Sequence, residues 1–478
     1  MTKAGAIAEL LHAGLASAQA GRVDEAAATY EKVLRRDARN HDALHLLGLA
    51  EAQRGRLDRA IQLLRRATAL YPSWPAALTN LGVLLNRRRR PEEALAVFDR
   101  ALAIESGHAV ALSNRGLALV ALQRPDDALA SFDRALAADP RYAEAHADRG
   151  LALRELQRPR DALASFLRAV ALRPGLAAAR FAAGQCHLLL GEFEQGWQEY
   201  EHRPASPDAR LRGRPRWDGG PLHGRTLLLH AEQGMGDTVQ FCRYAAMAAA
   251  CGGPVLLEAP APLLPVLRSL AGPTALIARG DALPAFDVHC PLMSLPLAFG
   301  TVADTIPAAP AYLSADPERI MQWSERLGSR SRPRVGLAWS GDGRHPNDHN
   351  RSLTFEELAP LLTADVDWVS LQREVRDADA GAFARSGVRH FGTALTDYGE
   401  TAALIASLDM VVAVDTGVAH LAGALGKPTA VMLPWVAEWR WLQDHNDTPW
   451  YPSLRLVRQP TIRNWPAVLD RVRRMLPL

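Results

Sequence analysis

The chain has 478 residues and a net charge of +3, with 48% hydrophobic and 22% charged residues. This length allows two to four domains, each able to bury a core of its own, and the composition is that of ordinary globular protein. Basic and acidic residues number 28 and 24 up to Arg203, and 27 and 28 after it. Because neither part has a basic excess, the composition argues against a nucleic-acid partner.

The amino-terminal segment, residues 4–20, ends in small residues like a signal sequence, but Glu9 and His12 interrupt its apolar stretch. We therefore expect a helix of the mature protein. No uninterrupted apolar run approaches the roughly 18 residues that a membrane-spanning helix requires. The four cysteines show no metal or redox spacing and fit a reducing cytoplasm, so we expect a cytoplasmic protein without a membrane span.

The first two hundred residues repeat with a period of 34. Glycines recur at Gly14, Gly48, Gly82, Gly116, Gly150 and Gly184. Large residues keep the same step at Tyr30, Leu64, Phe98, Phe132, Phe166 and Tyr200. This pattern resembles the tetratricopeptide repeat, with five full units and a partial sixth over about residues 5–203. Such repeats predict an α-solenoid of stacked helix pairs with a concave binding face.

Three polar residues follow the same period inside the repeats. Asn80, Asn114 and Asp148 each lie two residues before a repeat glycine, on the first helix of a unit. At that position side-chain amides can grip the backbone of an extended acceptor peptide. The alternative is that asparagine is simply common at this position of the repeat.

After Arg203 the period stops, and a segment rich in proline, glycine and arginine follows. Apolar strands then alternate with helices in two series. Within residues 226–258 we expect an apolar strand, a glycine-rich turn, a helix of about fourteen residues and another strand. The second series starts with a strand in residues 333–339, and further strands are expected at 368–371, 410–414, 429–433 and 454–457. The pattern predicts two Rossmann-like halves, at residues 204–332 and 333–478, with a ligand cleft at the carboxyl ends of the strands.

The segment "VVAVDTGVAHLAGALGKPTAVML", residues 411–433, places Asp415, Thr416 and Gly417 between a buried strand and a helix that carries His420. Thr416 can cap the helix, Gly417 lets a phosphate approach free N–H groups, and His420 can donate to a phosphate oxygen. Asp415 can orient His420 or bind a sugar hydroxyl. An ordinary helix cap with a satisfied histidine remains the alternative.

Two motifs together indicate a family. "DTGVAHLAGALGKP" resembles the donor-phosphate motif of the glycosyltransferase family 9 enzymes, the ADP-heptose heptosyltransferases, and "HAEQGMGDTVQFCRYA" resembles their amino-terminal glycine–aspartate loop. The order of tetratricopeptide repeats followed by these motifs resembles bacterial repeat-containing glycosyltransferases, which are distantly similar to the protein O-GlcNAc transferases. The resemblance implies a GT-B fold and inverting transfer of a sugar from a nucleotide donor, without a metal or other cofactor.

The resemblance also implies roles for single residues. Asp237 matches the candidate general base, and Gly234 and Gly236 of the same loop are expected to bind the donor. Thr416, Gly417 and His420 match residues that bind the diphosphate, and Asp415 matches an acidic residue near the donor sugar. The family's lysine after the first strand of the second half is missing here, so Arg344 or Arg351 must supply the cation.

Other candidates follow from residue type alone. His345 lies beside the expected diphosphate site and is the second candidate base if Asp237 only caps its helix. Trp439 or Trp441 can stack on the nucleotide base or the sugar, or belong to a packed loop. Asp377–Asp379 imitates the metal signature of the other large glycosyltransferase fold, but it lies in a polar helical stretch, so we expect no metal.

The sequence therefore predicts a glycosyltransferase whose repeats recruit the acceptor, either a protein serine or threonine or a glycan. Two alternatives remain open. One is a non-catalytic scaffold with a relic nucleotide-sugar-binding region, and the other is a nucleotide-sugar epimerase on the same two halves.

Overall fold

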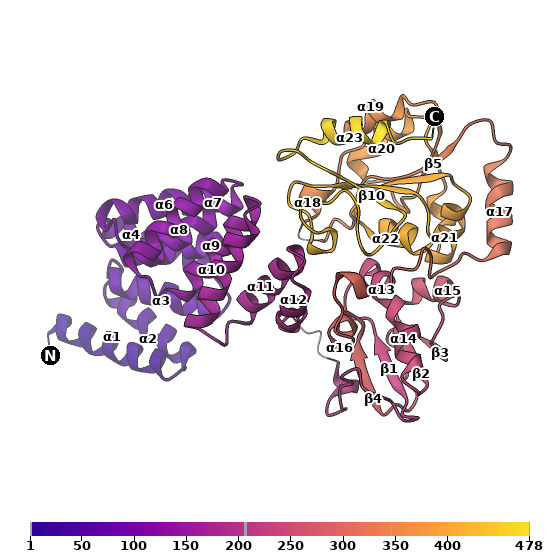
Figure 1. Ribbon diagram of the computed structural model, residues 1–478. Helices are drawn as coiled ribbons and strands as arrows, with labels where there is room; N and C mark the ends of the chain where they lie inside the picture. Colours follow the sequence, from indigo (N-terminus) through magenta and orange to yellow (C-terminus); the bar gives the residue numbers. More distant parts are fainter. Residues whose placement is uncertain (1, 205–207, 346, 478) are drawn as a thin grey trace. The chain divides into compact units, whose positions relative to one another are not determined.

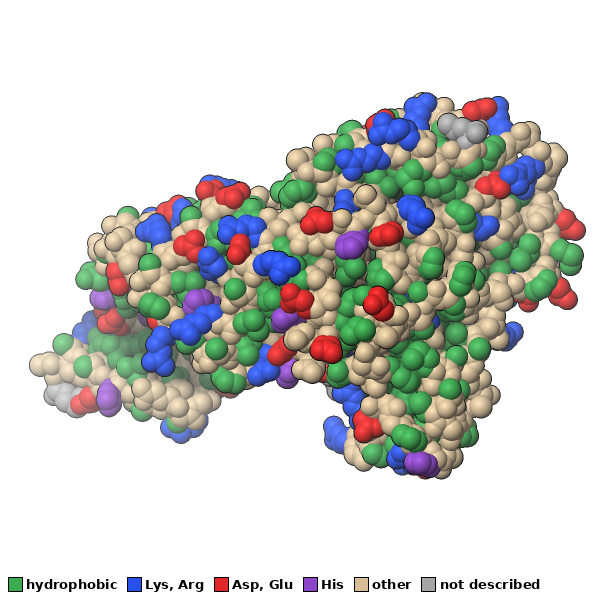
Figure 2. Space-filling view, viewed as in Figure 1, with side chains coloured by type: hydrophobic (Ala, Val, Ile, Leu, Met, Phe, Trp, Pro, Cys, Tyr) green, Lys and Arg blue, Asp and Glu red, His purple; other side chains and the backbone are tan. Residues whose placement is uncertain are grey.

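The computed structural model describes residues 2–204, 208–345 and 347–477. It forms two compact units, Met1–Arg180 and Phe181–Leu478 (Figure 1). On the visible face of each unit, basic and acidic side chains are interspersed (Figure 2).

The first unit is an array of antiparallel helix pairs, which confirms the predicted repeats. Its helices are α1 Lys3–Gln19, α2 Val23–Arg36, α3 His41–Gln53, α4 Leu57–Leu70, α5 Pro75–Arg87, α6 Pro91–Ile104, α7 Ala109–Ala121, α8 Pro125–Ala138, α9 Ala143–Glu155 and α10 Pro159–Leu172. The repeat glycines let the two helices of a pair approach each other. A Cβ atom added to Gly82 would lie 2.5 Å from the ring of Phe98 in the same pair, so a larger residue does not fit.

The predicted sixth pair is α11 Ala177–Leu189 and α12 Phe193–Tyr200. The division between the two units falls inside α11, and α12 belongs to the core of the second unit through Phe193, Trp197 and Tyr200. The indole Nε1 of Trp197 donates to the carbonyl of Thr301 at 2.9 Å. The boundary expected from the sequence, after residue 203, thus lies on the carboxyl-terminal side of a helix pair that packs with the α/β unit.

The second unit contains two parallel sheets, as the GT-B expectation requires. In the first, β1 Leu227–His230, β2 Val255–Ala259, β3 Ala275–Ala278 and β4 Val288–Pro291 follow the order β3-β2-β1-β4. In the second, β5 Arg334–Ala338, β6 Asp367–Ser370, β7 Arg389–His390, β8 Met410–Val414, β9 Thr429–Leu433 and β10 Leu454–Arg458 follow the order β10-β9-β8-β5-β6-β7. Residues Leu227–Leu229 of β1 and all of β8 are buried apolar runs of the kind that parallel sheets require.

Short helices connect the strands. They are α13 Met235–Phe241, α14 Ala245–Ala250, α15 Leu264–Leu267, α16 Leu295–Ala298, α17 Pro317–Leu327, α18 Asp348–Arg351, α19 Ala359–Leu362, α20 Asp377–Ala384, α21 Tyr398–Ala406, α22 Gly417–Ala424 and α23 Trp465–Arg473. The single helix expected after β1 is split into α13 and α14 by the 3₁₀ turn Cys242–Tyr244. Figure 1 shows α19 and α23 on one face of the second sheet, and α21 and α22 on the other.

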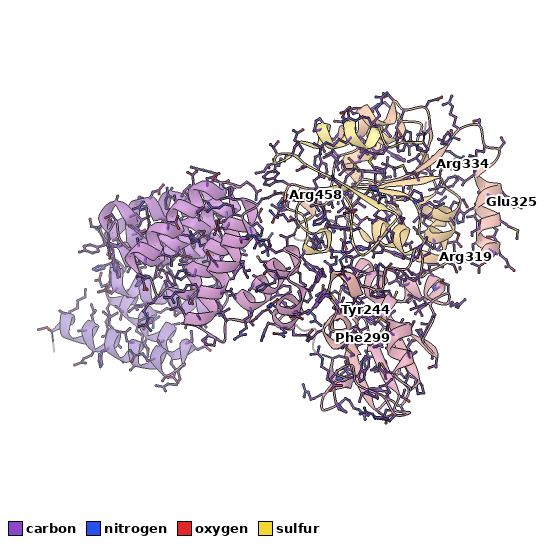
Figure 3. All side chains as sticks on the ribbon, viewed as in Figure 1. Tyr244, Phe299, Arg319, Glu325, Arg334 and Arg458 are labelled. Carbon is purple, nitrogen blue, oxygen red and sulfur yellow. The ribbon has the colours of Figure 1, made fainter. Side chains whose placement is uncertain are left out.

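Helix α17 lies before the expected boundary at residue 333 but packs on α21 of the second half. Arg319 pairs with Asp397 at 2.7 Å, and the Trp323 indole donates to Glu400 at 2.8 Å. Arg334 at the start of β5 donates to the carbonyl of Gly328 at 2.6 Å and so fixes the carboxyl end of α17 (Figure 3). The two halves are thus joined by a helix that is anchored on the second.

Candidate active site

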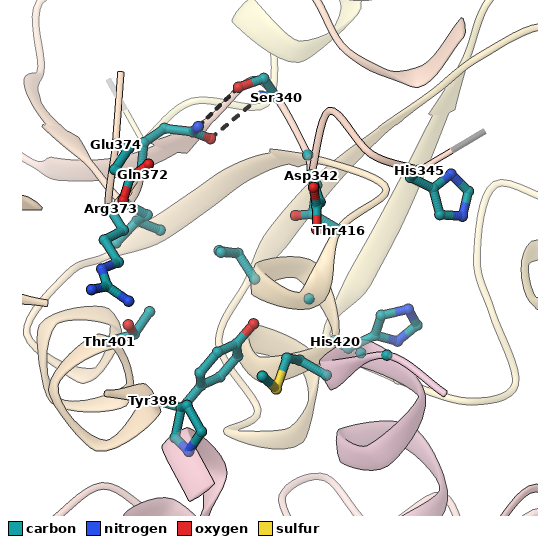
Figure 4. A pocket seen from close by; sticks show the side chains of 18 of the residues that line it. Ser340, Asp342, His345, Gln372, Arg373, Glu374, Tyr398, Thr401, Thr416 and His420 are labelled. Carbon is teal, nitrogen blue, oxygen red and sulfur yellow. Dashed lines mark hydrogen bonds between the residues drawn. The ribbon is translucent and has the colours of Figure 1, made fainter. Parts of the chain in front are cut away.

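A cavity of about 1240 Å³ lies between the two sheets of the second unit. Its walls are loops that follow strand carboxyl ends, which is where open α/β sheets bind ligands. The lining includes residues 233–237 after β1, 340–345 after β5, 371–377 after β6, 395–398 before and at the start of α21, and 415–418 after β8, together with Arg351, His420, Glu438 and Arg440 (Figure 4). The motifs that the sequence singled out in the two halves therefore meet at one cavity.

Asp237 lies in this wall, at the third residue of α13. Its Oδ2 accepts a hydrogen bond from the backbone N–H of Gly234 at 2.9 Å, so the side chain does close the loop at the helix start. Its Oδ1 accepts from Nη2 of Arg440, a residue of the second half. Asp237 can therefore cap the helix and still present a carboxylate oxygen to the cavity, because Oδ2 bonds the loop and Oδ1 faces the Arg440 cation.

The loop containing Gly236 touches the start of α22. A Cβ atom added to Gly236 would lie 2.8 Å from Cδ2 of His420. Glycine is thus required here because the loops of the two halves meet across this residue, whereas the sequence suggested only a role in donor binding.

The start of α22 differs in one detail from the expectation. Thr416 occupies the N-cap position, but its side chain makes no capping hydrogen bond, so the prediction that Thr416 caps the helix through its hydroxyl is wrong. Its Oγ1 is buried and has no hydrogen-bond partner among the described residues. A buried, unpaired hydroxyl in a cavity wall is a group that a ligand can satisfy. A Cβ at Gly417 would lie 2.7 Å from the hydroxyl of Tyr398.

Tyr398 is a wall residue that sequence reasoning missed. It begins α21 and points into the cavity beside Thr416 (Figure 4). Burial raises the pKa of its phenol to about 12, so the hydroxyl stays protonated and can donate. Nothing in its spacing to the motifs marks it in the sequence.

His420 is buried and held on two sides. Its Nδ1 lies 2.9 Å from the hydroxyl of Tyr451, and its ring stacks on Trp441 at 5.3 Å. Burial, followed by the charges of Arg440, Arg243 and Arg351, lowers the pKa of the imidazole well below its ordinary value. The ring is therefore neutral near pH 7, and Nε2 carries the proton when the Tyr451 hydroxyl donates to Nδ1.

Asp415 is buried at the end of β8. Burial and then the charge of Glu438 raise the pKa of its carboxyl to about 6. Its backbone carbonyl accepts from Nη1 of Arg351 at 3.0 Å. A carboxyl group with this pKa changes its charge near pH 6, within the pH range in which most enzymes are assayed.

The structure distinguishes Arg344 from Arg351, the two candidates for the cation between which the sequence could not choose. Arg344 is 91% exposed and pairs with Asp342 in its own loop, which lowers the pKa of Asp342 to about 2. Arg351 is 14% exposed, and its Nη2 lies 2.7 Å from the Cβ position of Gly341. Its Nε has no hydrogen-bond partner among the described residues, so the guanidinium retains a buried donor for an anion.

His345 lines the cavity as expected. Burial and then the charge of Arg351 lower the pKa of its ring. Its Nδ1 accepts from the backbone N–H of Asn347 at 3.2 Å, which places the proton of the neutral ring on Nε2. In this arrangement His345 presents a donor, and it accepts a proton only after that bond breaks.

Trp439 and Trp441 are both buried and do not line the cavity. Trp439 packs edge-on against Trp197 at 5.3 Å, and Trp441 is stacked on His420. Neither ring presents a free face for a nucleotide base.

The residues beside these two tryptophans are the ones that reach the cavity, and the sequence did not single them out. Arg440 donates from Nε to Gln240 at 2.8 Å and pairs with both Asp237 and Glu438. Burial alone lowers the pKa of Arg440, but Asp237 and Glu438 together raise it above its ordinary value. A permanently charged guanidinium therefore lies between two carboxylates of the cavity.

The polar positions of the repeats lie at equivalent places on α5, α7 and α9. The amide of Asn80 lies 2.9 Å from Nε2 of His45, and the amide of Asn114 donates to Val110 at 2.9 Å. Asp148 accepts from the hydroxyl of Ser113 at 3.4 Å, and burial raises its pKa to about 7. Each of the three side chains is partly exposed.

Comparisons with known proteins agree with a chain that consists of a repeat array and an α/β unit. Tetratricopeptide-repeat models match residues 11–75, 75–141, 113–177 and 148–209. The model of glycosyltransferase family 9 (heptosyltransferase) matches residues 393–432, which include Tyr398 and the β8–α22 turn. The chain thus combines an array of tetratricopeptide repeats with a GT-B-type α/β unit. More particularly, residues 393–432 of that unit are similar to glycosyltransferase family 9 (heptosyltransferase).

Protein FlbA of Caulobacter vibrioides is 29% identical over 328 residues, which cover 62% of this chain and 54% of FlbA. The chain therefore spans about half the length of this curated relative. Solved structures similar to the repeats include MamA (24% identity, 34% of this chain, 94% of that chain, TM-score 0.32) and PilF of Pseudomonas aeruginosa (18%, 41%, 90%, 0.38).

No described helix is long and apolar enough to cross a membrane. Within the same part of the chain, no group of three His, Cys, Asp or Glu side chains is arranged to hold a metal ion.

Proposed function

We propose that the protein is an inverting, metal-independent glycosyltransferase that moves a sugar from a nucleotide donor to an acceptor recruited by the repeats. The observation that carries the proposal is the meeting of Asp237 with the α22 start at one cavity. Residues 204–332 form the acceptor side and residues 333–478 the donor side. Four cysteines without a disulfide fit a cytoplasmic enzyme.

The donor diphosphate binds at the start of α22. There the free N–H groups, the unpaired Thr416 hydroxyl and the Nε2 edge of His420 surround an anion, and Arg351 supplies the cation in place of the family's lysine. Arg351 is favoured over Arg344 because its guanidinium is buried in the cavity wall.

The acceptor hydroxyl attacks the anomeric carbon from the side of the first half. As its oxygen forms the new glycosidic bond, the bond to the diphosphate breaks, and the electron pair leaves with the nucleoside diphosphate. The proton of the hydroxyl passes to Asp237, whose oxygens each keep a lone pair beyond their present hydrogen bonds.

Asp237→Asn tests this chemistry. An amide cannot take up the proton, so transfer should fall on the order of 10²–10⁴-fold, while nucleoside diphosphate affinity measured by calorimetry stays near that of the wild type. The amide also loses one of two hydrogen bonds, which costs about 1.5–3 kcal/mol of stability. Assays should therefore be run well below the melting temperature of the variant.

The matched control is Asp342→Asn. It removes a carboxylate of the same cavity that also pairs with an arginine, Arg344, but it belongs to the loop after β5 and not to the glycine–aspartate loop of the first half. Near-normal transfer by Asp237→Asn, or an equal loss in Asp342→Asn, contradicts the assignment of the base. Incubating the wild type with donor alone tests the first alternative, because an epimerised sugar nucleotide indicates an epimerase. The absence of both donor hydrolysis and turnover with any acceptor indicates a scaffold.

The repeats recruit the acceptor through the ladder of Asn80, Asn114 and Asp148. Deleting residues 2–176 removes this ladder but keeps α11 and α12, which pack with the α/β unit. Donor affinity should persist, and use of the natural acceptor should fall. Equal turnover of that acceptor by the shortened protein counts against recruitment by the array.

A further inference from the structure

The last helix pair departs from the other repeats at one periodic position. In the third, fourth and fifth pairs the aromatic ring covers the glycine of its own pair, and a Cβ at Gly150, for example, would lie 2.6 Å from the ring of Phe166. In the sixth pair a Cβ at Gly184 would instead lie 2.7 Å from the backbone nitrogen of Tyr200. The α12 backbone has taken the place of the ring, so the ring of Tyr200 points elsewhere.

The Tyr200 ring lies between Phe181 of its own helix pair, with ring centroids 5.1 Å apart, and Trp439 of the α/β unit. It packs edge-on against Trp439, with ring centroids 5.5 Å apart and an interplanar angle of 68°. Trp197, one turn earlier on α12, meets the same indole at 5.3 Å. Aromatic pairs of this geometry contribute about 0.5–1.5 kcal/mol beyond the area they bury. Two rings of α12 therefore fix the position of Trp439.

Trp439 precedes the arginine that faces the proposed base. Trp439–Trp441 form a single 3₁₀ turn, so a displacement of the Trp439 indole also displaces the backbone of Arg440. The charges of Arg440, Asp237 and Glu438 all act on the Tyr200 phenol, whose pKa is raised to about 12, chiefly by burial. The Tyr200 side chain thus lies within the field of the charged cluster at the cavity.

The same loop is held from its other side by the second half. Arg458 donates from Nη2 to the carbonyls of Trp441 and Leu442, the latter at 2.9 Å (Figure 3). On the side of the first half, Thr301 accepts two hydrogen bonds. Its hydroxyl accepts from the hydroxyl of Tyr244 at 3.0 Å, and its backbone carbonyl accepts from the indole of Trp197. Helix α12 therefore connects the first half to the loop that carries Arg440.

We propose that Tyr200 is a positioning residue for sugar transfer: through Trp439 it holds Arg440 against Asp237, which makes the last repeat pair part of the active-site support. The proposal rests on the proposed function for its catalytic readout. It gives the sixth repeat a role different from that of the array, because the other rings at this position pack within the repeats.

The test compares Tyr200→Leu with Phe166→Leu, which removes the equivalent ring of the fifth repeat, and with Tyr200→Phe, which keeps the ring. Release of nucleoside diphosphate from a panel of ADP-, GDP- and UDP-sugars gives kcat and donor KM. Amide hydrogen exchange of residues 436–443, followed by mass spectrometry without any ligand, gives the order of the loop.

For Tyr200→Leu we expect kcat to fall about 10- to 100-fold with donor KM nearly unchanged, since small misplacements of supporting groups have effects of this size. Exchange of residues 436–443 should become faster. Tyr200→Phe should retain both properties, and Phe166→Leu should lower only the melting temperature. If Tyr200→Leu does not fold, Trp439→Phe, which shrinks the same contact, should show the same fall in kcat.

Unchanged loop exchange in Tyr200→Leu, or the same change in Phe166→Leu, overturns the positioning role. If the wild type releases no nucleoside diphosphate from any donor, the proposed function fails. The exchange comparison still decides whether α12 orders the Arg440 loop, so the two failures are distinguishable.

Discussion

Replacing Asp148 with asparagine should stabilise the array at pH 8 and do so much less at pH 5. Asp148 lies on α9, where burial raises the pKa of its carboxyl from 3.8 to about 7, and where the hydroxyl of Ser113 is its hydrogen-bond partner. Asparagine has nearly the same shape, can accept from the same hydroxyl and carries no charge. The substitution therefore removes an unfavourable charge and keeps the contact.

The sign and size follow from proton binding. Between pH 4 and 7 the folded state holds a proton on Asp148 that the unfolded chain has lost, so the wild-type free energy of unfolding falls as pH rises through this range and is constant above it. A pKa difference of about 3 corresponds to about 4 kcal/mol at most. The advantage of Asp148→Asn should thus grow by about 2–3 kcal/mol between pH 5 and pH 8, or by several degrees in melting temperature.

Calorimetry of the full chain at pH 5, 6, 7 and 8 measures this, with Asp126→Asn, an exposed aspartate of α8, as control. A gain in melting temperature that is equal at all four pH values, or a loss at pH 8, refutes the assignment of a buried charge to Asp148. The result also bears on the acceptor ladder, because a protonated Asp148 can donate to a peptide carbonyl as asparagine does.

Three further changes probe the cavity. Gly236→Ala should lower stability by about 1–3 kcal/mol because the new methyl meets a fixed imidazole, whereas Gly343→Ala, whose Cβ has open space, should be neutral; calorimetry checks both. Arg351→Gln should weaken nucleoside diphosphate binding about tenfold or more, and Arg344→Gln should leave the dissociation constant nearly unchanged. Because the pKa of Asp415 is about 6, its ionisation above that pH opposes an anion; wild-type affinity relative to Asp415→Asn should therefore rise as pH falls from 7.5 to 5.5, and a constant ratio contradicts this.

Much of the fold could be predicted from periodicity. The spacing of 34 places every helix pair of the array, and the apolar runs at residues 410–414 and 429–433 are β8 and β9 as the structure has them. These elements depend on local patterns, which a sequence displays directly. The packing of α17 on α21 and of α12 on the α/β core depends instead on contacts between distant segments, such as Trp323 with Glu400, which no local pattern reveals.

The candidate site shows the same limit. The β8–α22 turn could be located from the sequence because a hydroxyl residue and a glycine directly after a buried strand form a local pattern that is typical of an anion-binding helix start. Tyr398 could not be found, since its hydroxyl meets Gly417 only in the folded chain. Of the two arginines, only the structure distinguishes the exposed Arg344 from the buried Arg351.

The segment Glu438–Trp441 explains why the sequence indicated the right loop but the wrong side chains. Its tryptophans pack inward, Trp439 on α12 and Trp441 on His420, while Glu438 and Arg440 face the cavity. The aromatic residues that draw attention in the sequence are thus the support, and the charged residues between them reach the site. A loop that touches α12, α13 and α22 at once cannot move without affecting all three. The α/β unit therefore has to be taken together with α11 and α12, and under the proposed function a truncation inside residues 177–200 should impair transfer as well as recruitment.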